Sequence, residues 1–316
     1  MTSSDTSTAI AVLGNGIIGH AVAELFASAG HPVVMIGRSD RSLARAMTNI
    51  ETSLKEFVAN DLLDAAKVPD ILKRIRTSTD LNDAASAELV VEAVTEDMPL
   101  KLDLFEQLDA ICPPTTILAS SSGHPASELV ERVKHRHRVI ATHFWYPPQL
   151  FPMLEVCAGP ETAPDVLERT CALLRGAGKE PVVIEQEVPG FLFNRIQFAA
   201  LREAWSLWAS GVASAEAIDA VVRQGLGRRY TITGPIESAD VGGLDTLYAF
   251  AQSLQPDLDT RPQPPDEVGA LVRQGHRGLV SGRGIYDWSK RDGAALLQAR
   301  RAELFRWLKE DQKKKS

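Results

Sequence analysis

The sequence has little cysteine, no long apolar run and no excess of positive charge. Its three cysteines form no CxxC pair, so neither a disulfide framework nor a zinc site is indicated, and this usage fits the reducing cytosol. Without a run of about 18 uncharged apolar residues, no segment is expected to span a membrane. A formal net charge of −7 offers nothing that attracts a nucleic-acid backbone or an anionic membrane surface. We therefore expect neither nucleic acid nor a membrane as a partner.

Two further features are missing from the sequence. No His, Asp or Glu residues are spaced as in a metal site, so no metal is expected. The N-terminal segment, residues 1–8, is rich in Ser and Thr and lacks the basic and apolar regions of a signal peptide. Together with the cysteine usage, this predicts a cytoplasmic protein.

Short apolar runs alternate with helical stretches in the first part of the chain. The expected strands are residues 9–13, 33–36, 89–94, 116–119, 139–142, 153–156 and 182–184. Helical patterns such as 43–57 and 100–110 lie between them. This alternation is typical of a doubly wound α/β sheet.

Beyond residue 188 the sequence shows only helical periodicity. The expected helices are residues 191–210, 215–224, 244–253, 265–273 and 294–309. We therefore predict an α/β domain of residues 1–188 and a smaller all-helical domain of residues 189–316. The stretch 191–209 is apolar on nearly every face, which is typical of a helix buried in the core or in a subunit contact, and the core is the simpler interpretation.

A glycine-rich turn joins the first expected strand to the helix that follows. It reads Gly14-Asn15-Gly16-Ile17-Ile18-Gly19, a GxGxxG. The first glycine permits a tight turn, the second lets the backbone approach a pyrophosphate, and the third lets helix and strand pack closely. The alternative is a chance glycine turn, but the strand-turn-helix context favours a Rossmann-type dinucleotide site that includes Ile17 and Ile18.

The end of the second expected strand distinguishes the two nicotinamide cofactors. NAD enzymes usually place a carboxylate there for the ribose 2′-hydroxyl, whereas this chain has Gly37, Arg38 and Ser39. A guanidinium fits a 2′-phosphate, so we predict NADPH in preference to NADH. In the alternative interpretation, Arg38 is a solvated charge and Asp40 contacts the ribose.

Four further blocks accompany the glycine turn. They are Ser120-Ser121-Ser122-Gly123, the segment 142–148 (THFWYPP), Met153-Leu154-Glu155-Val156 and the segment 189–195 (PGFLFNR). In order and spacing they resemble the blocks SSTSG or ASNTSS, HFFNP, LVEV and PGFxxNR of the L-3-hydroxyacyl-CoA dehydrogenase superfamily. The segments 203–205, 225–230 and 234–237 resemble its short branch, which includes lambda-crystallin and bacterial 3-hydroxybutyryl-CoA-type dehydrogenases. The segment 282–288 resembles the TGxGFYDW closing motif of many members of the superfamily.

The resemblance implies an NAD(P)-dependent oxidoreductase that interconverts a 3-hydroxy and a 3-oxo acid or acyl-CoA. His143 would be the general base for alcohol oxidation and the general acid for ketone reduction. Glu155, 12 residues later, would bond the other ring nitrogen. Ser122 would hold the substrate oxygen, and Asn194 would donate a hydrogen bond in the same region.

The same resemblance places Glu96 and Lys101 near the cofactor ribose and nicotinamide. It also implies a homodimer formed by the helical domain. By itself, a histidine at a strand end such as His143 is more often a structural residue, and the serines could form an ordinary polar turn. The matching blocks favour catalysis instead.

The chain departs from the family pattern at the expected substrate pocket. Tyr146 replaces the asparagine of HFFNP, so the pocket that includes Ser121, Trp145 and Tyr146 is expected to differ. Because the serine loop is one residue shorter than usual, counting back from His143 favours Ser122 over Ser121 as the substrate contact. Ser53 is retained on the helix that contacts CoA in the acyl-CoA enzymes, but Asn60 stands where those enzymes have a lysine. A small free acid is therefore as consistent with the sequence as a CoA thioester.

Two other functions stay open. The altered pocket suits an imine or ketone reductase on the same scaffold, although Asn194 and Arg195 stand where imine reductases and related hydroxyacid dehydrogenases carry a lysine or another donor. A non-catalytic, NADPH-binding protein of the crystallin or sensor type would bind cofactor without turnover. The set of His143, Glu155 and Asn194 argues against that function, because a pure binder has no need of it.

The cofactor prediction is tested by the variant Arg38→Ala. Loss of the guanidinium should lower kcat/KM with NADPH relative to kcat/KM with NADH, because only the former cofactor carries the 2′-phosphate. Steady-state kinetics with both cofactors measure this ratio, and an unchanged ratio would remove Arg38 from the cofactor site.

Overall fold

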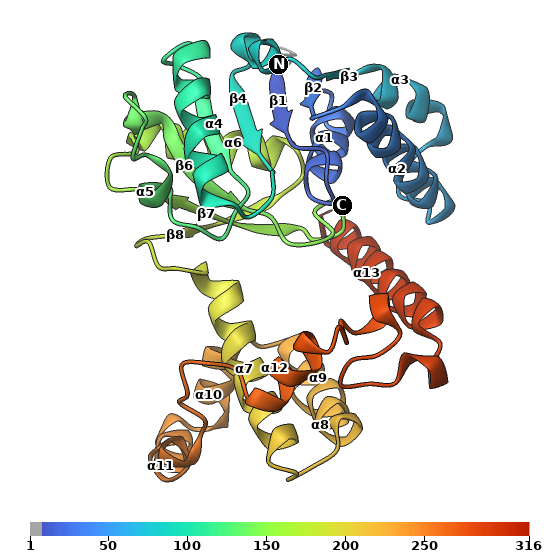
Figure 1. Cartoon of the computed structure of the whole chain (residues 1–316), viewed down its shortest axis with the longest axis vertical. Helices are drawn as coiled ribbons and strands as arrows, with labels where there is room; N and C mark the ends of the chain where they lie inside the picture. Colours follow the sequence, from blue (N-terminus) through green and yellow to red (C-terminus); the bar gives the residue numbers. More distant parts are fainter. Residues whose placement is uncertain (1–7, 316) are drawn as a thin grey trace. The chain divides into compact units, whose positions relative to one another are not determined.

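One mixed sheet organises the first part of the chain in the computed structural model, which describes residues 8–315 (Figure 1). Residues 1–7, on which the expected lack of a signal peptide rests, lie outside the described residues. By their contacts the described residues form two compact units. The first unit extends to Leu192 and resumes at Arg301, and the second unit comprises Phe193–Arg300.

The sheet of the first unit has eight strands. They are β1 (Ile10–Leu13), β2 (Val33–Ile36), β3 (Ile75–Ser78), β4 (Leu89–Glu92), β5 (Ile117–Ser120), β6 (Val139–His143), β7 (Met153–Ala158) and β8 (Glu180–Ile184). Their order is β3-β2-β1-β4-β5-β6-β7-β8, and β1 to β6 are parallel, whereas β7 runs antiparallel to β6. The order of the first six strands is that of dinucleotide-binding sheets, so the predicted Rossmann-type fold is confirmed.

Helices cover both faces of this sheet. They are α1 (Gly19–Ser28), α2 (Asp40–Ala59), α3 (Val68–Lys73), α4 (Met98–Ile111), α5 (Ala126–Leu129) and α6 (Pro164–Gly176). Along β1 the side chains alternate between two hydrophobic clusters. Ile10 and Val12 pack with α1, α2 and α6, whereas Ala11 and Leu13 pack with α4 and α5. This period of two is what a strand buried on both faces requires.

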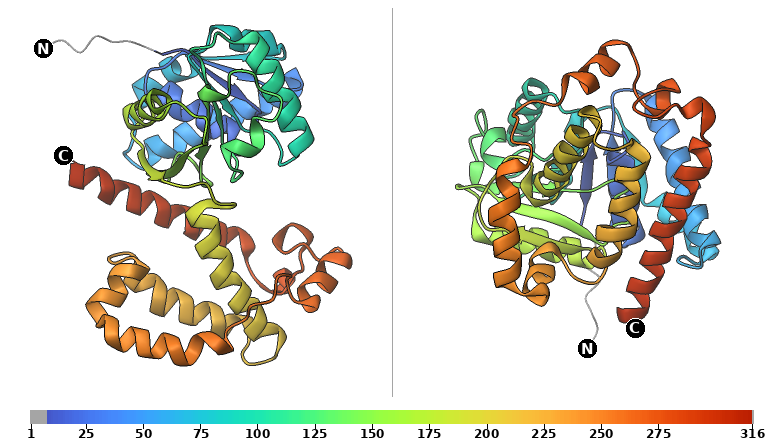
Figure 2. Two further views of the ribbon diagram at one scale, coloured as in Figure 1. Left: turned by 90° about the vertical axis from the view of Figure 1, so that its left-hand side faces the viewer. Right: turned by 90° about the horizontal axis from the view of Figure 1, so that it is seen from below.

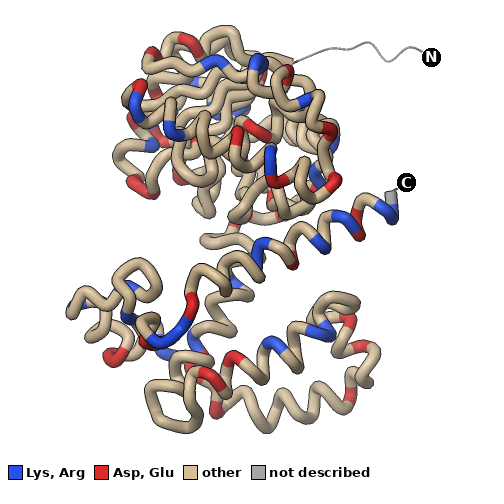
Figure 3. The backbone as a smooth tube through the Cα atoms, turned by 90° about the vertical axis from the view of Figure 1, so that its right-hand side faces the viewer, with Lys and Arg blue, Asp and Glu red and all other residues tan. Residues whose placement is uncertain are grey.

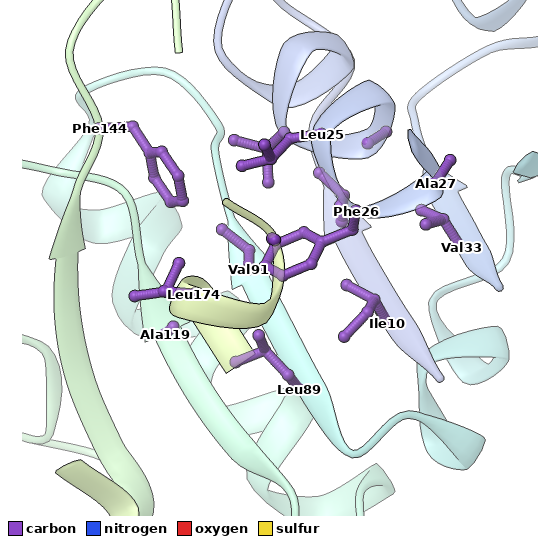
Figure 4. Packing of buried hydrophobic residues seen from close by; sticks show 14 of the residues in the cluster. Ile10, Leu25, Phe26, Ala27, Val33, Leu89, Val91, Ala119, Phe144 and Leu174 are labelled. Atoms are coloured by element: carbon purple, nitrogen blue, oxygen red, sulfur yellow. The ribbon is translucent and has the colours of Figure 1, made fainter. Parts of the chain in front are cut away.

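Phe26 of α1 lies near the centre of the first cluster. Figure 4 shows its ring between the helix and the sheet, beside Val91 and Ile10. Phe144, the residue after His143, enters the same cluster. Burial of a side chain of this size stabilises the fold by about 2 kcal/mol. The chain next to the predicted catalytic histidine is therefore anchored in the core.

The strand β3 was not expected from the sequence. It reads Ile-Arg-Thr-Ser, and only Ile75 is buried, because β3 is the edge strand and pairs with β2 alone. A half-exposed edge strand needs no apolar run, so it left no such signal in the sequence.

The second unit is helical. Its elements are α7 (Phe191–Ala209), which begins in the first unit, α8 (Ala215–Val221), α9 (Gly227–Tyr230), α10 (Pro235–Gly242), α11 (Leu244–Leu254), α12 (Asp266–Arg273) and the first part of α13 (Gly293–Lys315). Figure 2 shows this part of the chain, in yellow to orange, as helices and connecting segments. Residues 193–300 contain only isolated bridges and no strand, which agrees with the predicted all-helical part.

Almost no side chain of the second unit is buried. Among residues 193–300 only Pro265 and Gly293 are buried. Phe191 is the single buried residue of α7, and Phe198 is 56% exposed. The prediction of α7 as a core helix is therefore wrong for the single chain. Its apolar faces have no core in this unit to enter.

The C-terminal part of α13 belongs to the first unit and packs on α2. The ring of Phe305 meets Phe57 edge to face, and Arg301 pairs with Glu56. Figure 3 shows basic and acidic residues interspersed along this helix. Its contact with α2 thus combines a buried aromatic pair with ion pairing at the rim.

The three cysteines are free and buried. Burial raises the pKa of the Cys112 and Cys171 thiols, and it raises the pKa of Cys157 to about 11. Within residues 8–315 no helix has the length and apolar character needed to cross a bilayer.

Candidate functional site

The glycine turn lies between β1 and α1, at the point where the strand order of the sheet reverses. Gly14 has a φ of +97°, and a Cβ there would lie 2.4 Å from the carbonyl oxygen of Ala93. A Cβ on Gly19 would lie 2.0 Å from the carbonyl oxygen of Gly14. Both glycines are therefore required by close packing of this turn against α1 and the chain after β4. Gly16 differs, because a Cβ there would have no atom within 4 Å.

The open space at Gly16 suits an anion. It adjoins the N-terminus of α1, whose first turn carries no acidic residue, so the positive end of the helix dipole is not neutralised. Ile17 beside it is 62% exposed, and Ile18 is the N-cap residue. His20 contacts the carbonyl oxygen of Gly16, and burial lowers the pKa of its imidazole. These residues fit the pyrophosphate of a dinucleotide.

The chain after β2 carries the residues predicted to select the cofactor. Gly37 packs closely on Asn15 and Leu43, while Arg38, Ser39 and Asp40 are exposed. Ser39 caps α2, because its hydroxyl oxygen accepts a hydrogen bond from the backbone N–H of Ser42. Ser39 therefore has a local structural role that the sequence pattern did not indicate.

A buried carboxylate, Glu92, organises the ends of β4 and β5. One of its oxygens accepts hydrogen bonds from Lys101 Nζ at 2.7 Å and from the backbone N–H of Val94 at 2.8 Å. The other accepts the hydroxyl proton of Ser120 at 2.6 Å. Sequence reasoning missed Glu92, although a lone carboxylate in the buried run Leu89–Val94 must have a partner.

The predicted residues Ser122, Glu96 and Lys101 come together above Glu92. The buried Ser122 hydroxyl donates to Glu96 Oε2 at 2.8 Å, and Lys101 Nζ lies 3.6 Å from the same oxygen. Ser121 is half-buried and donates its N–H to the carbonyl of Glu92. His124, which the sequence analysis passed over, lies between Glu96 and Glu128.

His143 and Glu155 are paired across two antiparallel strands. They are register partners in β6 and β7, and His143 Nδ1 lies 2.7 Å from Glu155 Oε2. Glu155 also accepts hydrogen bonds from the indole of Trp145 and from the backbone N–H of Leu192 at the start of α7. A carboxylate on Nδ1 favours the tautomer with its proton there, which leaves Nε2 as a proton acceptor.

The serine loop and His143 lie at the same edge of the sheet. β5 and β6 are parallel neighbours in which Ser120 pairs with Ala141. Ser122 lies two residues after Ser120, and His143 lies two residues after Ala141, so both come after the same point of the sheet. The hydroxyl of Thr142 bonds the carbonyl of Ser120 across the same strands. The carboxyl edge of parallel strands is where such folds bind their ligands.

Tyr146 and Trp145 belong to the aromatic loop, residues 144–152, which joins β6 to β7. Tyr146 is 54% exposed, whereas Trp145 packs on Phe151 and bonds Glu155. Asn194 lies in the first turn of α7 and belongs to the second unit, so its approach to His143 stays a prediction. No group of three or more His, Cys, Asp or Glu side chains among residues 8–315 could hold a metal ion.

Two protein-family models match the chain. The model of the NAD-binding domain of 3-hydroxyacyl-CoA dehydrogenase matches residues 9–188, and the model of the C-terminal domain of that enzyme matches residues 190–288.

Several characterised proteins are similar to the chain in sequence. It is 35% identical to the 3-hydroxyadipyl-CoA dehydrogenase of Escherichia coli over 92% of its own length, and it spans 61% of that enzyme. It is 33% identical to the 5-formyl-3-hydroxy-2-methylpyridine 4-carboxylate 5-dehydrogenase of Mesorhizobium japonicum, covering 93% of this chain and 94% of that one. A lambda-crystallin homolog of Bos taurus is 34% identical, covering 85% and 86%.

Solved structures agree with this picture. The crystal structure of a 5-formyl-3-hydroxy-2-methylpyridine 4-carboxylic acid 5-dehydrogenase, an NAD⁺-dependent dismutase, superposes with a TM-score of 0.87 and 30% identity over 96% of this chain and 99% of that one. The 3-hydroxybutyryl-CoA dehydrogenase of Escherichia coli gives a TM-score of 0.76 and 34% identity, covering 91% of this chain and 61% of that one.

The glycine turn yields a matched pair of variants. Gly14→Ala should destabilise the protein by at least about 2 kcal/mol, because a Cβ there meets the backbone of Ala93 and the φ is positive. Gly16→Ala should leave the free energy of unfolding nearly unchanged but weaken dinucleotide binding by about tenfold, because its Cβ enters the open space. Urea unfolding and cofactor titration measure the two effects. Equal cofactor affinity in Gly16→Ala and wild type would contradict the assignment.

Proposed function

The chain belongs to the 3-hydroxyacyl-CoA dehydrogenase family, an enzyme family of NAD-dependent oxidoreductases, and on that premise we propose that it transfers a hydride to or from carbon 3 of a 3-hydroxy or 3-oxo acid. The observation that carries the proposal is the 2.7 Å contact of His143 with the buried Glu155, beside the serine loop. A buried imidazole-carboxylate pair at a ligand-binding edge suits proton transfer.

The proposed residues divide the reaction between them. The nicotinamide ring, when bound, accepts or supplies the hydride. In alcohol oxidation, His143 Nε2 takes the hydroxyl proton while carbon 3 loses a hydride. In ketone reduction, His143 gives the proton back to the substrate oxygen. Glu155 stabilises the imidazolium that forms. Ser122 contacts the substrate oxygen, and its bond to Glu96 fixes the direction of its hydroxyl.

We also propose roles for the remaining predicted residues. The exposed Arg38 pairs with a 2′-phosphate and gives a preference for NADPH. Lys101 pairs with the buried Glu92 and lies 3.6 Å from Glu96, the residue that also bonds Ser122 of the serine loop. This position supports a role for Glu96 and Lys101 beside the cofactor. Asn194 completes the substrate-oxygen site from α7. Tyr146, Trp145 and Ser121 line the substrate pocket.

A small free acid is the favoured substrate. Ser53, on the helix that would contact CoA, donates to Glu24 and accepts from Gln149. Asn60 bonds the carbonyl of Glu56, and the C-terminal part of α13 packs on α2. These contacts occupy the polar groups that a CoA phosphate would need. A similar protein that acts on a pyridine carboxylate superposes better than one named for a CoA thioester, with TM-scores of 0.87 and 0.76.

Ketone reduction without an acid group is the second candidate. It is favoured by the exposed phenol of Tyr146 and by likeness to a diketoreductase at 28% identity and a TM-score of 0.71. A substrate series with and without the carboxylate separates the two activities.

The experiment that tests the function compares wild type with His143→Ala. With acetoacetate as substrate, His143→Ala should lower kcat by at least about 100-fold, the low end for general acid-base catalysis. His137→Ala, which removes a histidine near the opposite end of β6, is the matched control and should keep normal turnover. Acetoacetyl-CoA in parallel distinguishes thioester from free acid. Cofactor binding without turnover of any 3-oxo compound or imine would favour a non-catalytic protein.

We further propose that the chain forms a homodimer through residues 189–316. The second unit exposes large apolar side chains such as Ile236, Val241 and Phe250, and it buries almost none of its own. Large apolar side chains that a single chain leaves exposed in this way are typical of a subunit interface. Light scattering coupled to gel filtration at micromolar concentration should give twice the chain mass. A monomer alone would refute the dimer.

A further inference from the structure

One buried carboxyl group has no part in the proposed reaction. Glu24 lies in α1, within the otherwise apolar stretch Ala21–Ala27, and is 2% exposed. Its Oε1 accepts the hydroxyl proton of Ser53 on α2 at 2.8 Å. Its Oε2 has no hydrogen-bond partner among the described residues. An unsatisfied buried carboxylate oxygen is costly, so its retention inside an apolar helix face needs a reason.

The same serine contacts the aromatic loop. Gln149 of this loop donates from Nε2 to Ser53 Oγ at 3.1 Å. Its other amide atom, Oε1, is also buried without a hydrogen-bond partner in residues 8–315. The chain Gln149-Ser53-Glu24 therefore has one unsatisfied oxygen at each end. Both are acceptors, so they cannot satisfy one another while Glu24 is ionised.

A single proton resolves both defects. A protonated carboxyl group is a hydrogen-bond donor, so Oε2–H of Glu24 would donate to Oε1 of Gln149. This bond would complete a ring with the two bonds described above, from Gln149 to Ser53 and from Ser53 to Glu24. We propose that Glu24 is protonated in the working protein and acts, with Ser53, as a positioning residue that holds Gln149 and hence the aromatic loop that carries Tyr146. This inference rests on the proposed function in so far as Tyr146 lines the substrate pocket.

The surroundings of Glu24 favour the protonated form. Burial raises the pKa of Glu24 to about 8, against the opposing effects of the hydrogen bond from Ser53, of Arg301 on α13 and of Lys179 before β8. Glu56 on α2 is the acidic group that faces it and adds to the rise. At neutral pH the carboxyl is therefore mostly neutral, and above about pH 8 it becomes an anion.

Ionisation should loosen one of the attachments that hold the middle of the aromatic loop. Another attachment is Lys179, whose ammonium donates to the carbonyl oxygens of Pro148 and Phe151, each at 2.6 Å. When Glu24 loses its proton, Gln149 Oε1 loses its donor and faces a negative charge instead. The middle of the loop then keeps the bonds of Lys179 but loses the support of Gln149, so Tyr146 is held less firmly while His143 and Glu155 keep their own contact. Substrate binding should weaken, and the chemical step should not.

The first experiment separates KM from kcat as a function of pH. In wild type, KM for the 3-oxo substrate should rise about threefold to tenfold between about pH 7 and pH 9.5, the effect of losing one hydrogen bond. Glu24→Gln keeps an amide of the same shape that donates to Gln149 at every pH, so its KM should stay low. Gln149→Leu removes the acceptor, so its KM should be raised throughout. The pH profile of kcat should be alike in all three proteins.

Glu51→Gln is the matched control. It removes a half-exposed carboxylate of α2 that pairs with Lys55 and lies outside the ring, so its KM should follow the wild-type pH profile. The same rise of KM in Glu24→Gln as in wild type would overturn the proposal, as would a flat profile in wild type.

The second experiment needs no substrate. A carboxyl group whose pKa is raised in the folded chain holds a proton that the unfolded chain releases, so wild type loses stability as pH rises from the ordinary glutamate pKa toward about 8. Glu24→Gln has no such proton. The Tm of Glu24→Gln minus that of wild type should therefore grow by about 3 °C or more between about pH 6 and pH 9. For Glu51→Gln the difference should stay constant.

An unchanged difference for Glu24→Gln would show that Glu24 is ionised throughout and would overturn the proposal. The unfolding comparison also separates this inference from the proposed function. If the protein turns over no 3-oxo compound, the proposed function fails, and the two Tm values still decide whether Glu24 carries the proton.

Discussion

Glu155 is buried in a β-strand, where an ionised carboxylate is stable only if hydrogen-bond donors surround it. Its donors include the ring of His143, the indole of Trp145 and the backbone N–H of Leu192. The same contacts that make the charge tolerable also fix the imidazole, the base of the aromatic loop and the first turn of α7. The candidate site depends on this one group, because its loss would release all three segments at once.

The neighbouring strands repeat this arrangement. Glu92 ends β4 as a buried carboxylate, and Lys101, Ser120 and the N–H of Val94 satisfy it. Both acidic residues lie at the sheet edge where β4, β5 and β6 end, and their partners come from neighbouring strands and from the segments that follow those strands. Buried carboxylates of this kind fix the positions of the segments that follow the strands. The glycine turn adds a third fixed loop, set by backbone packing of Gly14 on Ala93 and not by charge.

Apolar periodicity predicted the strands that are buried on both faces, and it missed the edge strand β3. β3 carries a single buried residue, Ile75, and so resembles a polar loop. The apolar faces of α7 indicated burial, but the single chain leaves Phe198 more than half exposed. An apolar pattern shows that a helix face has to be covered, but it does not show whether its own chain or another chain covers it. The contact of His143 with Glu155 was expected from the motifs, and Nδ1 lies 2.7 Å from Oε2, while the role of the two residues in proton transfer stays a proposal. The links of Glu92 to Ser120 and of Gln149 to Ser53 join segments 28 and 96 residues apart, and no local pattern encodes them.

The buried cysteines have a practical consequence. A thiol reacts as its thiolate and must be reached by the reagent, and Cys112, Cys157 and Cys171 are both enclosed and held in the protonated form. Maleimides and mild oxidants should therefore leave the native protein untouched. A cysteine introduced at an exposed position of each unit would then accept a spectroscopic label selectively, so that separations between the units become measurable in solution without first deleting any natural thiol.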